Sequence, residues 1–316
     1  MRTVLMAEDY EPRPQVITAE HLVQRAKFRA VDAHNHLPMQ NVARMGDVDL
    51  DGLVRTMDLL NLQAIVNLSG ASGDVLKLNL DKLDNAYPGR FLTFCNVDWT
   101  GVGEPGWAEH AVAALEADVK AGAKGLKVFK TLGLRARDIH GQQILPRGTR
   151  IADIWDKAGE LGIPVLIHTA DPLAFFRPLD RLNERWTELH DRPEWLFYGP
   201  EFPPFQELID ALYQMVEEHL NTTIITAHAG CYAENLGYVS KMLDKYPNLN
   251  TDYSARIAEL GRVPYSAREW FMKYADRIVF GTDERPAIAR DHPGIREMEG
   301  KDEYFDYIQR LLPQLS

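Results

Sequence analysis

Residues 31–36 read VDAHNH, a short apolar run that ends in two histidines one residue apart. Side chains at i and i+2 of a strand point to the same side, so both imidazoles can bind one metal ion. A single pair of this kind can equally be two hydrogen-bonded surface histidines. Three later runs end in the same manner, namely VLIH at 165–168, IITAH at 224–228 and IVFGTD at 278–283. The ends of parallel strands meet at one mouth of a closed barrel, so the four runs together predict a barrel with a metal centre.

The rest of the chain alternates short apolar runs with longer segments of helical periodicity, as β/α units do. The runs are nearly continuous in apolar residues, which is expected of parallel strands covered on both faces. We find no G-x-G-x-x-G or P-loop at the first strand-to-helix turn, which argues against an open doubly wound sheet. We therefore predict an α/β fold, a (β/α)8 TIM barrel forming a single domain over residues 1–316. The eight predicted strands are Ala30–Ala33, Ala64–Leu68, Phe91–Val97, Gly125–Phe129, Ile163–Ile167, Thr222–Thr226, Leu249–Tyr253 and Arg277–Phe280.

Four of the helices between these strands are marked by apolar stripes at helical spacing, over Leu50–Leu60, Ile151–Leu161, Phe205–Val216 and Leu236–Tyr246. The segment 171–204 interrupts the rhythm with many prolines and aromatic residues. It follows the fifth strand and should therefore overhang the catalytic face. We interpret it as a lid-like insertion, because long loops in compact domains usually serve a site; the alternative is an extra packing element.

Composition narrows the class of partner. The net charge of -11 disfavours nucleic acid and anionic membranes, both of which require a basic face, and no apolar stretch is long enough to span a bilayer. The N-terminus lacks the apolar run of a secretory signal, and the two cysteines, Cys95 and Cys231, show no close spacing. We expect a cytoplasmic enzyme with a small-molecule substrate, and a homo-oligomer is compatible with the sequence.

Three imidazoles and one carboxylate from these strand ends would suit zinc or another borderline divalent ion. A position left to water makes such a site catalytic. Asp283 could instead cap the N-terminus of a helix, since aspartate is favoured there. Its place in a Gly-Thr-Asp sequence after the last strand favours the catalytic interpretation.

Several motifs of the sequence resemble those of a known enzyme family. The DxHxH at 32–36, His168 and His228 at the ends of the fifth and sixth strands, and the GTD at 281–283 resemble the amidohydrolase superfamily. The runs AHAG at 227–230, PNLNTDYS at 247–254 and DRIVFGTD at 276–283 are similar to the amidohydrolase-related branch of aminocarboxymuconate-semialdehyde decarboxylase, resorcylate-type decarboxylases and pyrone-dicarboxylate lactonases. The resemblance spans most of the chain and implies the barrel and the metal. It implies no particular substrate, because that branch covers hydrolysis, decarboxylation and hydration.

The same resemblance implies roles for the site residues. His34, His36, His168 and Asp283 would hold one divalent ion, with His228 beside it. The ion would lower the pKa of water toward neutrality, and Asp283 would take the proton of that water and return it to the leaving group. His228 would polarise the substrate carbonyl or supply a proton.

A second resemblance concerns GLKVFK at 125–130, which is similar to the fourth-strand segment of the hydantoinase and dihydroorotase branches. It implies that Lys127 is carboxylated and bridges two metal ions. A lysine inside an apolar strand tends to lose its proton, which is the state that can capture carbon dioxide. An uncarboxylated Lys127 could instead pair with Asp283 or with a substrate carboxylate. We favour one ion, because longer stretches resemble the one-metal branch.

Three cationic residues near the strand ends, Arg256, Lys130 and Arg177, are candidates to bind substrate. Arg256 follows the seventh strand, where a guanidinium could clamp a carboxylate with two parallel hydrogen bonds. The leading hypothesis is a metal-dependent hydrolase of a small lactone, amide or ester that bears a carboxylate. The alternative is a metal-dependent, non-oxidative decarboxylase of a small aromatic or unsaturated acid. A more remote alternative is an inactive barrel that serves as a binding module, although no ligand of the predicted metal site is missing.

Overall fold

A computed structural model describes residues 15, 17, 23–37 and 49–284 of the 316-residue chain. The single domain predicted over residues 1–316 extends beyond these ranges and stays a prediction. Among the helices of the described part of the chain, none is long and apolar enough to cross a membrane.

All the paired strands of the described residues run parallel, in two sheets of order β1-β2-β3 and β4-β5-β6-β7-β8-β9. Strands β3 and β4 are two halves of one predicted strand, separated by Phe94. The backbone N–H of Phe94 still donates to Asn67, at 2.9 Å, while Cys95 donates to Gly125 on the other side, also at 2.9 Å. The strands are β1 Ala30–Asn35, β2 Leu62–Asn67, β3 Phe91–Thr93, β4 Cys95–Asn96, β5 Leu126–Val128, β6 Val165–Ile167, β7 Ile224–Thr226, β8 Leu249–Asp252 and β9 Ile278–Val279.

The last strand returns to the first. The backbone N–H of Ala33 donates to Phe280 at 2.8 Å, that of Asp283 donates to His34 at 2.7 Å, and Asn35 forms a parallel bridge with Glu284. These bonds join β9 to β1 beyond the two residues that form β9. With β3 and β4 counted as one strand, the described residues form eight strand positions, and the bonds from β9 to β1 close the ring. The predicted (β/α)8 barrel is confirmed.

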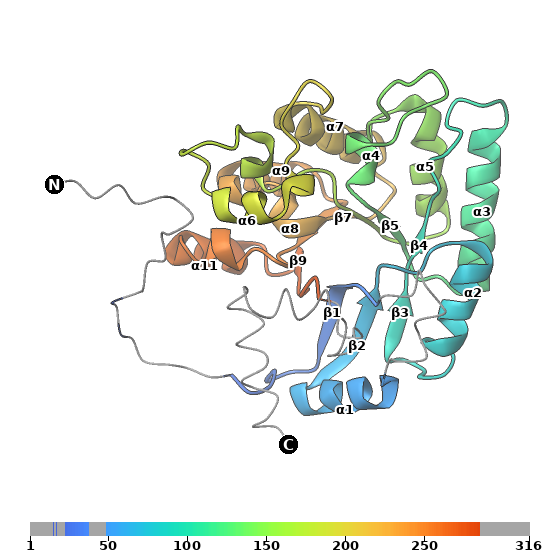
Figure 1. The fold of residues 1–316 in the computed structure, drawn as a ribbon. Helices are drawn as coiled ribbons and strands as arrows, with labels where there is room; N and C mark the ends of the chain where they lie inside the picture. The colour runs from blue at the N-terminus through green and yellow to red at the C-terminus, as the bar shows by residue number, and fades with distance from the viewer. Residues whose placement is uncertain (1–14, 16, 18–22, 38–48, 285–316) are drawn as a thin grey trace.

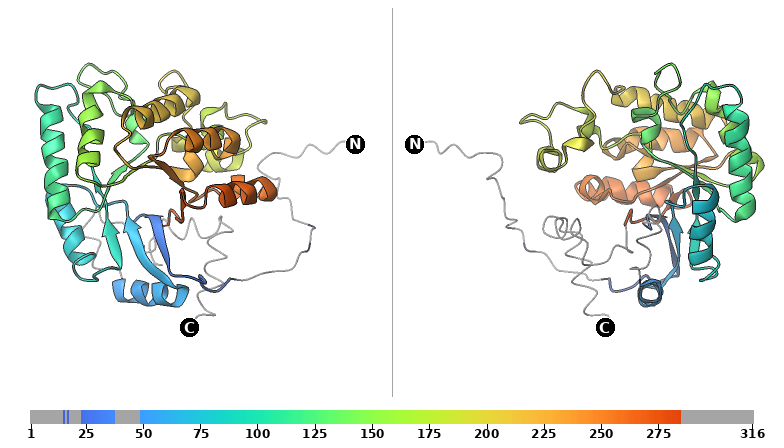
Figure 2. Two further views of the ribbon diagram at one scale, coloured as in Figure 1. Left: turned by 180° about the vertical axis from the view of Figure 1, so that it is seen from behind. Right: turned by 45° about the vertical axis from the view of Figure 1, so that its right-hand side comes forward.

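Helices cover the outside of the strands, with α2, α3 and α5 along one edge of the molecule (Figures 1 and 2). The four predicted helices are present as α1, α5, α7 and α9. In α7, the apolar stripe that includes Leu208, Leu212 and Val216 is fully buried against the strands. The helices are α1 Leu50–Leu60, α2 Gly73–Lys82, α3 Trp107–Ala121, α4 Thr131–Leu134, α5 Ala152–Glu160, α6 Trp186–Asp191, α7 Phe205–Glu218, α8 Ala227–Gly230, α9 Leu236–Lys245, α10 Ile257–Leu260 and α11 Pro264–Lys273; α4 and α8 are short and kinked.

The segment 171–204 after β6 contains α6 and two single helical turns, Leu173–Phe176 and Pro193–Trp195. Its aromatic residues pack against each other, with the ring centroids of Phe176 and Phe197 5.5 Å apart and both side chains buried. The segment is therefore a well-packed element of the fold. Its function as a lid stays a prediction.

Candidate metal centre

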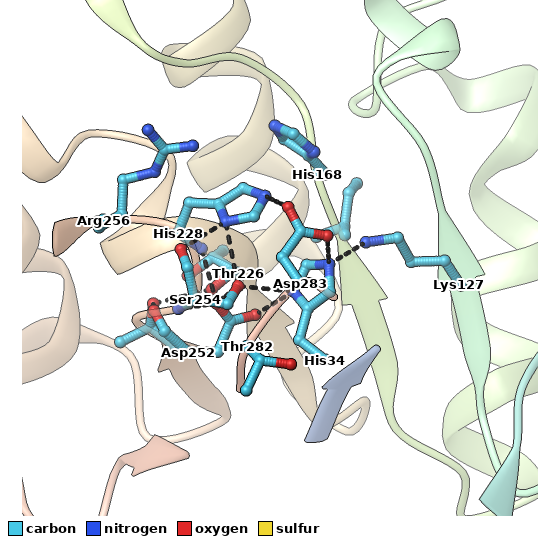
Figure 3. A network of polar contacts seen from close by, with 12 residues as sticks. His34, Lys127, His168, Thr226, His228, Asp252, Ser254, Arg256, Thr282 and Asp283 are labelled. Atoms are coloured by element: carbon cyan, nitrogen blue, oxygen red, sulfur yellow. Dashed lines mark hydrogen bonds and ion pairs between the residues drawn. The ribbon is translucent and has the colours of Figure 1, made fainter. Parts of the chain in front are cut away.

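The carboxyl ends of the strands bring together residues that are far apart in the sequence. His34 from β1, His228 after β7 and Asp283 after β9 meet beside Lys127 of β5 (Figure 3). The Nε2 atoms of His34 and His36 lie 3.3 and 3.2 Å from the same oxygen of Asp283, Oδ1. The other oxygen, Oδ2, lies 3.8 Å from Nε2 of His228.

The group His34, His36 and Asp283 has the chemistry of a divalent metal site. One ligand atom from each lies within 4.8 Å of the other two. Two imidazole nitrogens and a carboxylate oxygen are the donors that zinc and similar ions take. The three residues therefore fit a resident divalent ion.

Each of the two histidines is oriented through its second ring nitrogen. Nδ1 of His34 lies 2.8 Å from Asp252 and Nδ1 of His36 lies 2.8 Å from the hydroxyl of Ser69. Such outer partners fix the ring and leave Nε2 for the metal, as metal-binding histidines require. Sequence reasoning assigned no role to Asp252 or Ser69, although Asp252 stands in the PNLNTDYS run.

Asp252 is the centre of a fully buried network (Figure 3). Besides His34, its carboxylate accepts hydrogen bonds from the backbone N–H of His228 at 2.9 Å, and from the N–H and hydroxyl of Ser254 at 3.0 and 2.7 Å. Burial opposes ionisation, but the charge and hydrogen bond of His34, with the backbone N–H of His228, outweigh it and hold the pKa of Asp252 below its usual range. Asp252 thus connects β1, β7 and β8 at the mouth.

We expect Asp252→Ala to lower the free energy of unfolding by about 3–5 kcal/mol, the cost of leaving buried partners unpaired. The folded-state pKa of Asp252 is depressed, so its contribution is fully present above the unfolded value near 3.8 and is lost as the pH falls through the lower folded value. Urea unfolding should therefore show a gap between wild type and variant at pH 7 that narrows on strong acidification. Asp244→Ala, at an exposed ion pair with Lys273, is the control. An equal loss in both variants would contradict the role of Asp252.

The first and last strand ends are joined by Asp32, the aspartate of the DxHxH. Its carboxylate accepts from the hydroxyl and the backbone N–H of Thr282, at 2.6 and 3.0 Å. Glycine is required at 281, because a Cβ there would lie 2.6 Å from the Cβ of His34. The motifs DxHxH and GTD therefore place His34 and Asp283 next to each other.

The protonation states favour metal binding at His36 and Asp283. Burial lowers the pKa of His36 to about 4, so its imidazole is neutral near pH 7. Burial opposes ionisation of Asp283, but hydrogen bonds from His34 and His36 and the charge of His34 hold the pKa of Asp283 well below the usual range. Burial and Lys127 disfavour a charged His34, yet Asp252 and Asp283 outweigh them and raise its pKa. A proton on Nε2 of His34 has to leave before a metal ion can bind there, so binding becomes tighter as the pH rises.

His168 lies in a neighbouring group with Asp171 and His228. Its ring packs edge-on against that of His228, with the centroids 4.3 Å apart, and its Nε2 is hydrogen-bonded to Asp171. Burial and the charges of Lys130 and Lys127 lower the pKa of His168 well below its usual value. His168 is therefore neutral and close to the centre, and its role as a metal ligand stays a prediction.

The predicted cationic residues lie at different depths. Lys127 is buried with its Nζ 3.3 Å from Nε2 of His34, and burial lowers its pKa to about 8. Lys130 follows the end of β5 and reaches the backbone carbonyl of Asp171 at 3.3 Å. Arg256 is buried, whereas Arg177 is exposed on the insertion. The substrate-binding roles of Lys130, Arg256 and Arg177 stay predictions.

Two residues of the centre hold a left-handed backbone conformation, His228 with a φ of 58° and Asp283 with a φ of 63°. Residues with a Cβ rarely adopt this region, and such strain of about 1–3 kcal/mol each collects at functional sites. The neighbouring hydrogen bonds to Asp252 and His34 hold the two residues there.

These features define a barrel with a candidate metal centre at the carboxyl ends of its strands. The family model described as Amidohydrolase matches residues 31–294. The chain belongs to the amidohydrolase family, and it is a metal-dependent enzyme of that family. No curated protein shows a significant match to this chain.

Solved structures share the fold at low identity. A 2,6-dihydroxybenzoate decarboxylase from Rhizobium is 19% identical, with 81% of this chain and 88% of that chain covered at a TM-score of 0.51. A dihydroxybenzoic acid decarboxylase from a Polaromonas species, with bound manganese and the inhibitor 2-nitroresorcinol, is 18% identical, with 90% and 96% covered at a TM-score of 0.53. An uncharacterized TIM-barrel protein from Bordetella bronchiseptica is 14% identical, with 90% and 99% covered at a TM-score of 0.54.

Proposed function

We propose that this protein is a metal-dependent hydrolase that acts on a small lactone, amide or ester bearing a carboxylate. The observation that carries the proposal is the position of Asp283. One of its oxygens faces the Nε2 atoms of His34 and His36, and the other faces His228. An ionised carboxylate in this place adjoins both the candidate metal ligands and a second proton acceptor.

A divalent ion at this centre supplies Lewis-acid chemistry that lowers the pKa of water. Asp283, ionised near pH 7, can accept a proton from the attacking water and return it to the leaving group. Burial lowers the pKa of His228 well below its usual value, so its ring is neutral. Nδ1 of His228 lies 2.9 Å from the carbonyl of Ser254, which can only accept, so Nδ1 carries the hydrogen and Nε2 is a proton acceptor. His228 can therefore share with Asp283 the proton that passes from the water to the leaving group.

The test is a panel of carboxylate-bearing lactones, esters and amides, followed by acid release, run beside carboxylated phenols, followed by carbon dioxide release. We expect acid release from at least one of the first group at a rate that depends on added Zn²⁺ or Mn²⁺. Carbon dioxide release alone would contradict the hydrolase and favour the second candidate.

The second candidate is a metal-dependent decarboxylase of a small aromatic or unsaturated acid. It is supported by two of the structurally similar proteins, which are named as decarboxylases of dihydroxybenzoic acids. A sequence identity of 18–19% supports a shared fold but not a shared reaction, so the hydrolase remains the first proposal. In this alternative, Asp283 or His228 would deliver a proton to the ring carbon after carbon dioxide leaves.

We further infer a single ion, most simply zinc, with Lys127 uncarboxylated. The support is the length of the resemblance, because the runs 247–254 and 276–283 resemble the one-metal branch over more residues than 125–130 resembles the two-metal branch. Burial lowers the pKa of Lys127 to about 8, which makes the neutral amine that carboxylation requires more available, so carboxylation is tested directly. Titration of metal-free protein with Zn²⁺ should saturate near one equivalent, with or without bicarbonate. Two equivalents in bicarbonate, together with an intact mass that shows carboxylated lysine, would contradict this inference. A Lys127→Arg variant, which cannot be carboxylated, shows whether any second equivalent depends on Lys127.

A further inference from the structure

Four charged side chains of alternating sign, Asp171, Arg256, Glu259 and Arg185, form a row that begins at His168, and the first three are buried. Asp171 follows His168 by three residues, and its side chain is only 1% exposed. Its Oδ1 is the partner of Nε2 of His168, and its Oδ2 lies 3.1 Å from Nε of Arg256. One carboxylate therefore connects the histidine to a buried guanidinium.

Arg256 is held from its other side. Its terminal nitrogen lies 3.5 Å from Glu259 in α10, and the second oxygen of Glu259 accepts from Arg185. Arg185 directly precedes α6 in the insertion, so the row ties the insertion to the segment after β8. Because each buried charge would be costly without its neighbour, the members of the row hold one another in fixed positions.

The backbone of Asp171 also indicates a residue held in place by its surroundings. Its φ is 106°, outside the regions that residues with a Cβ favour. Its backbone carbonyl accepts from Nζ of Lys130, whose ammonium lies over the ring of Phe197, 5.1 Å from the centroid. Neighbouring residues therefore contact both the side chain and the main chain of Asp171.

We propose that Asp171 and Arg256 are positioning residues, in which Asp171 fixes the ring orientation and tautomer of His168 and Arg256 holds Asp171 in place. With Nε2 of His168 bound to Asp171, Nδ1 is the nitrogen left to face a metal ion or a substrate. The inference rests on the proposed metal-dependent function. It gives Arg256 a different role from the predicted clamp on a substrate carboxylate, because Arg256 already has two carboxylate partners within the protein.

The test is a double-mutant cycle on Zn²⁺ affinity, measured by competition with a chelator and without any substrate. It compares wild type, Asp171→Asn, His168→Gln and the double variant. We expect Asp171→Asn to weaken Zn²⁺ binding about 10–100-fold when His168 is present, the usual cost of losing an outer partner of a metal-binding histidine. In the His168→Gln background the same change should have little effect, because Asp171 acts through His168.

The control is Glu184→Gln, which breaks an exposed ion pair with Arg262 at 2.6 Å between the same two segments and should leave Zn²⁺ affinity unchanged. An equal loss from Asp171→Asn in both backgrounds, or no loss in either, would overturn the positioning role. If Asp171→Asn does not fold, Arg256→Lys replaces it in the same cycle, because lysine cannot bridge Asp171 and Glu259 as the guanidinium does. A wild-type protein without affinity for Zn²⁺ would overturn the proposed function as well as this inference, whereas tight binding that is insensitive to Asp171 would overturn this inference alone.

Discussion

Replacing Asp283 with asparagine is expected to lower kcat by about 10²–10⁴-fold, the usual contribution of a positioned general acid or base. The amide keeps the shape of the carboxylate and can still occupy the space between His34 and His228. It cannot take the proton of the attacking water. The measurement is steady-state turnover of the best compound in the substrate panel, with the metal content of each preparation determined in parallel.

Metal content matters here because Asp283 is also a candidate ligand. The comparison is therefore made at saturating Zn²⁺, where wild type and variant carry equal metal. Asp244→Asn, at a surface ion pair of α9, is the matched control and should keep wild-type turnover. Near-normal turnover of Asp283→Asn at equal metal content would remove Asp283 from the chemistry.

Removing the metal is expected to abolish turnover, and adding Zn²⁺ or Mn²⁺ should restore it. The neutral His36 and the ionised Asp283 at the centre are electron-pair donors, so neither can take the place of a Lewis acid. Metal-free protein should also unfold at a lower temperature, because an ion that binds only the folded state stabilises that state by mass action.

The measurement uses protein dialysed against a chelator and assayed after the chelator is removed. Protein dialysed against the same chelator saturated with Zn²⁺ serves as the control for nonspecific damage. Full turnover in a preparation shown by elemental analysis to lack divalent metal would contradict the metal-dependent mechanism.

Much of the barrel could be predicted from the sequence, because parallel strands buried on both faces leave nearly continuous apolar runs. The break at Phe94 and the particular backbone hydrogen bonds that join β9 to β1 could not be predicted. Both depend on which backbone N–H and C=O groups meet across neighbouring strands. The sequence of one strand does not show which residues of another strand it will pair with.

The residues of the site also fall into two groups, those that the sequence predicts and those that it does not. His34, His228 and Asp283 stand at the ends of apolar runs, so the fold alone brings them together. Ser69 and Asp171 are recognisable only through the histidine nitrogens that they contact, and an isolated serine or aspartate in a loop gives no such signal.

We propose that His34, His36 and Asp283 together hold a divalent ion. The most direct test is an anomalous difference map from crystals of the protein grown with Zn²⁺ and measured on both sides of the zinc edge. We predict a peak in contact with Nε2 of His34, Nε2 of His36 and a carboxylate oxygen of Asp283, and its loss in a His34→Ala, His36→Ala double variant. A map without a peak among these three side chains, or with an unchanged peak in the double variant, would contradict the claim.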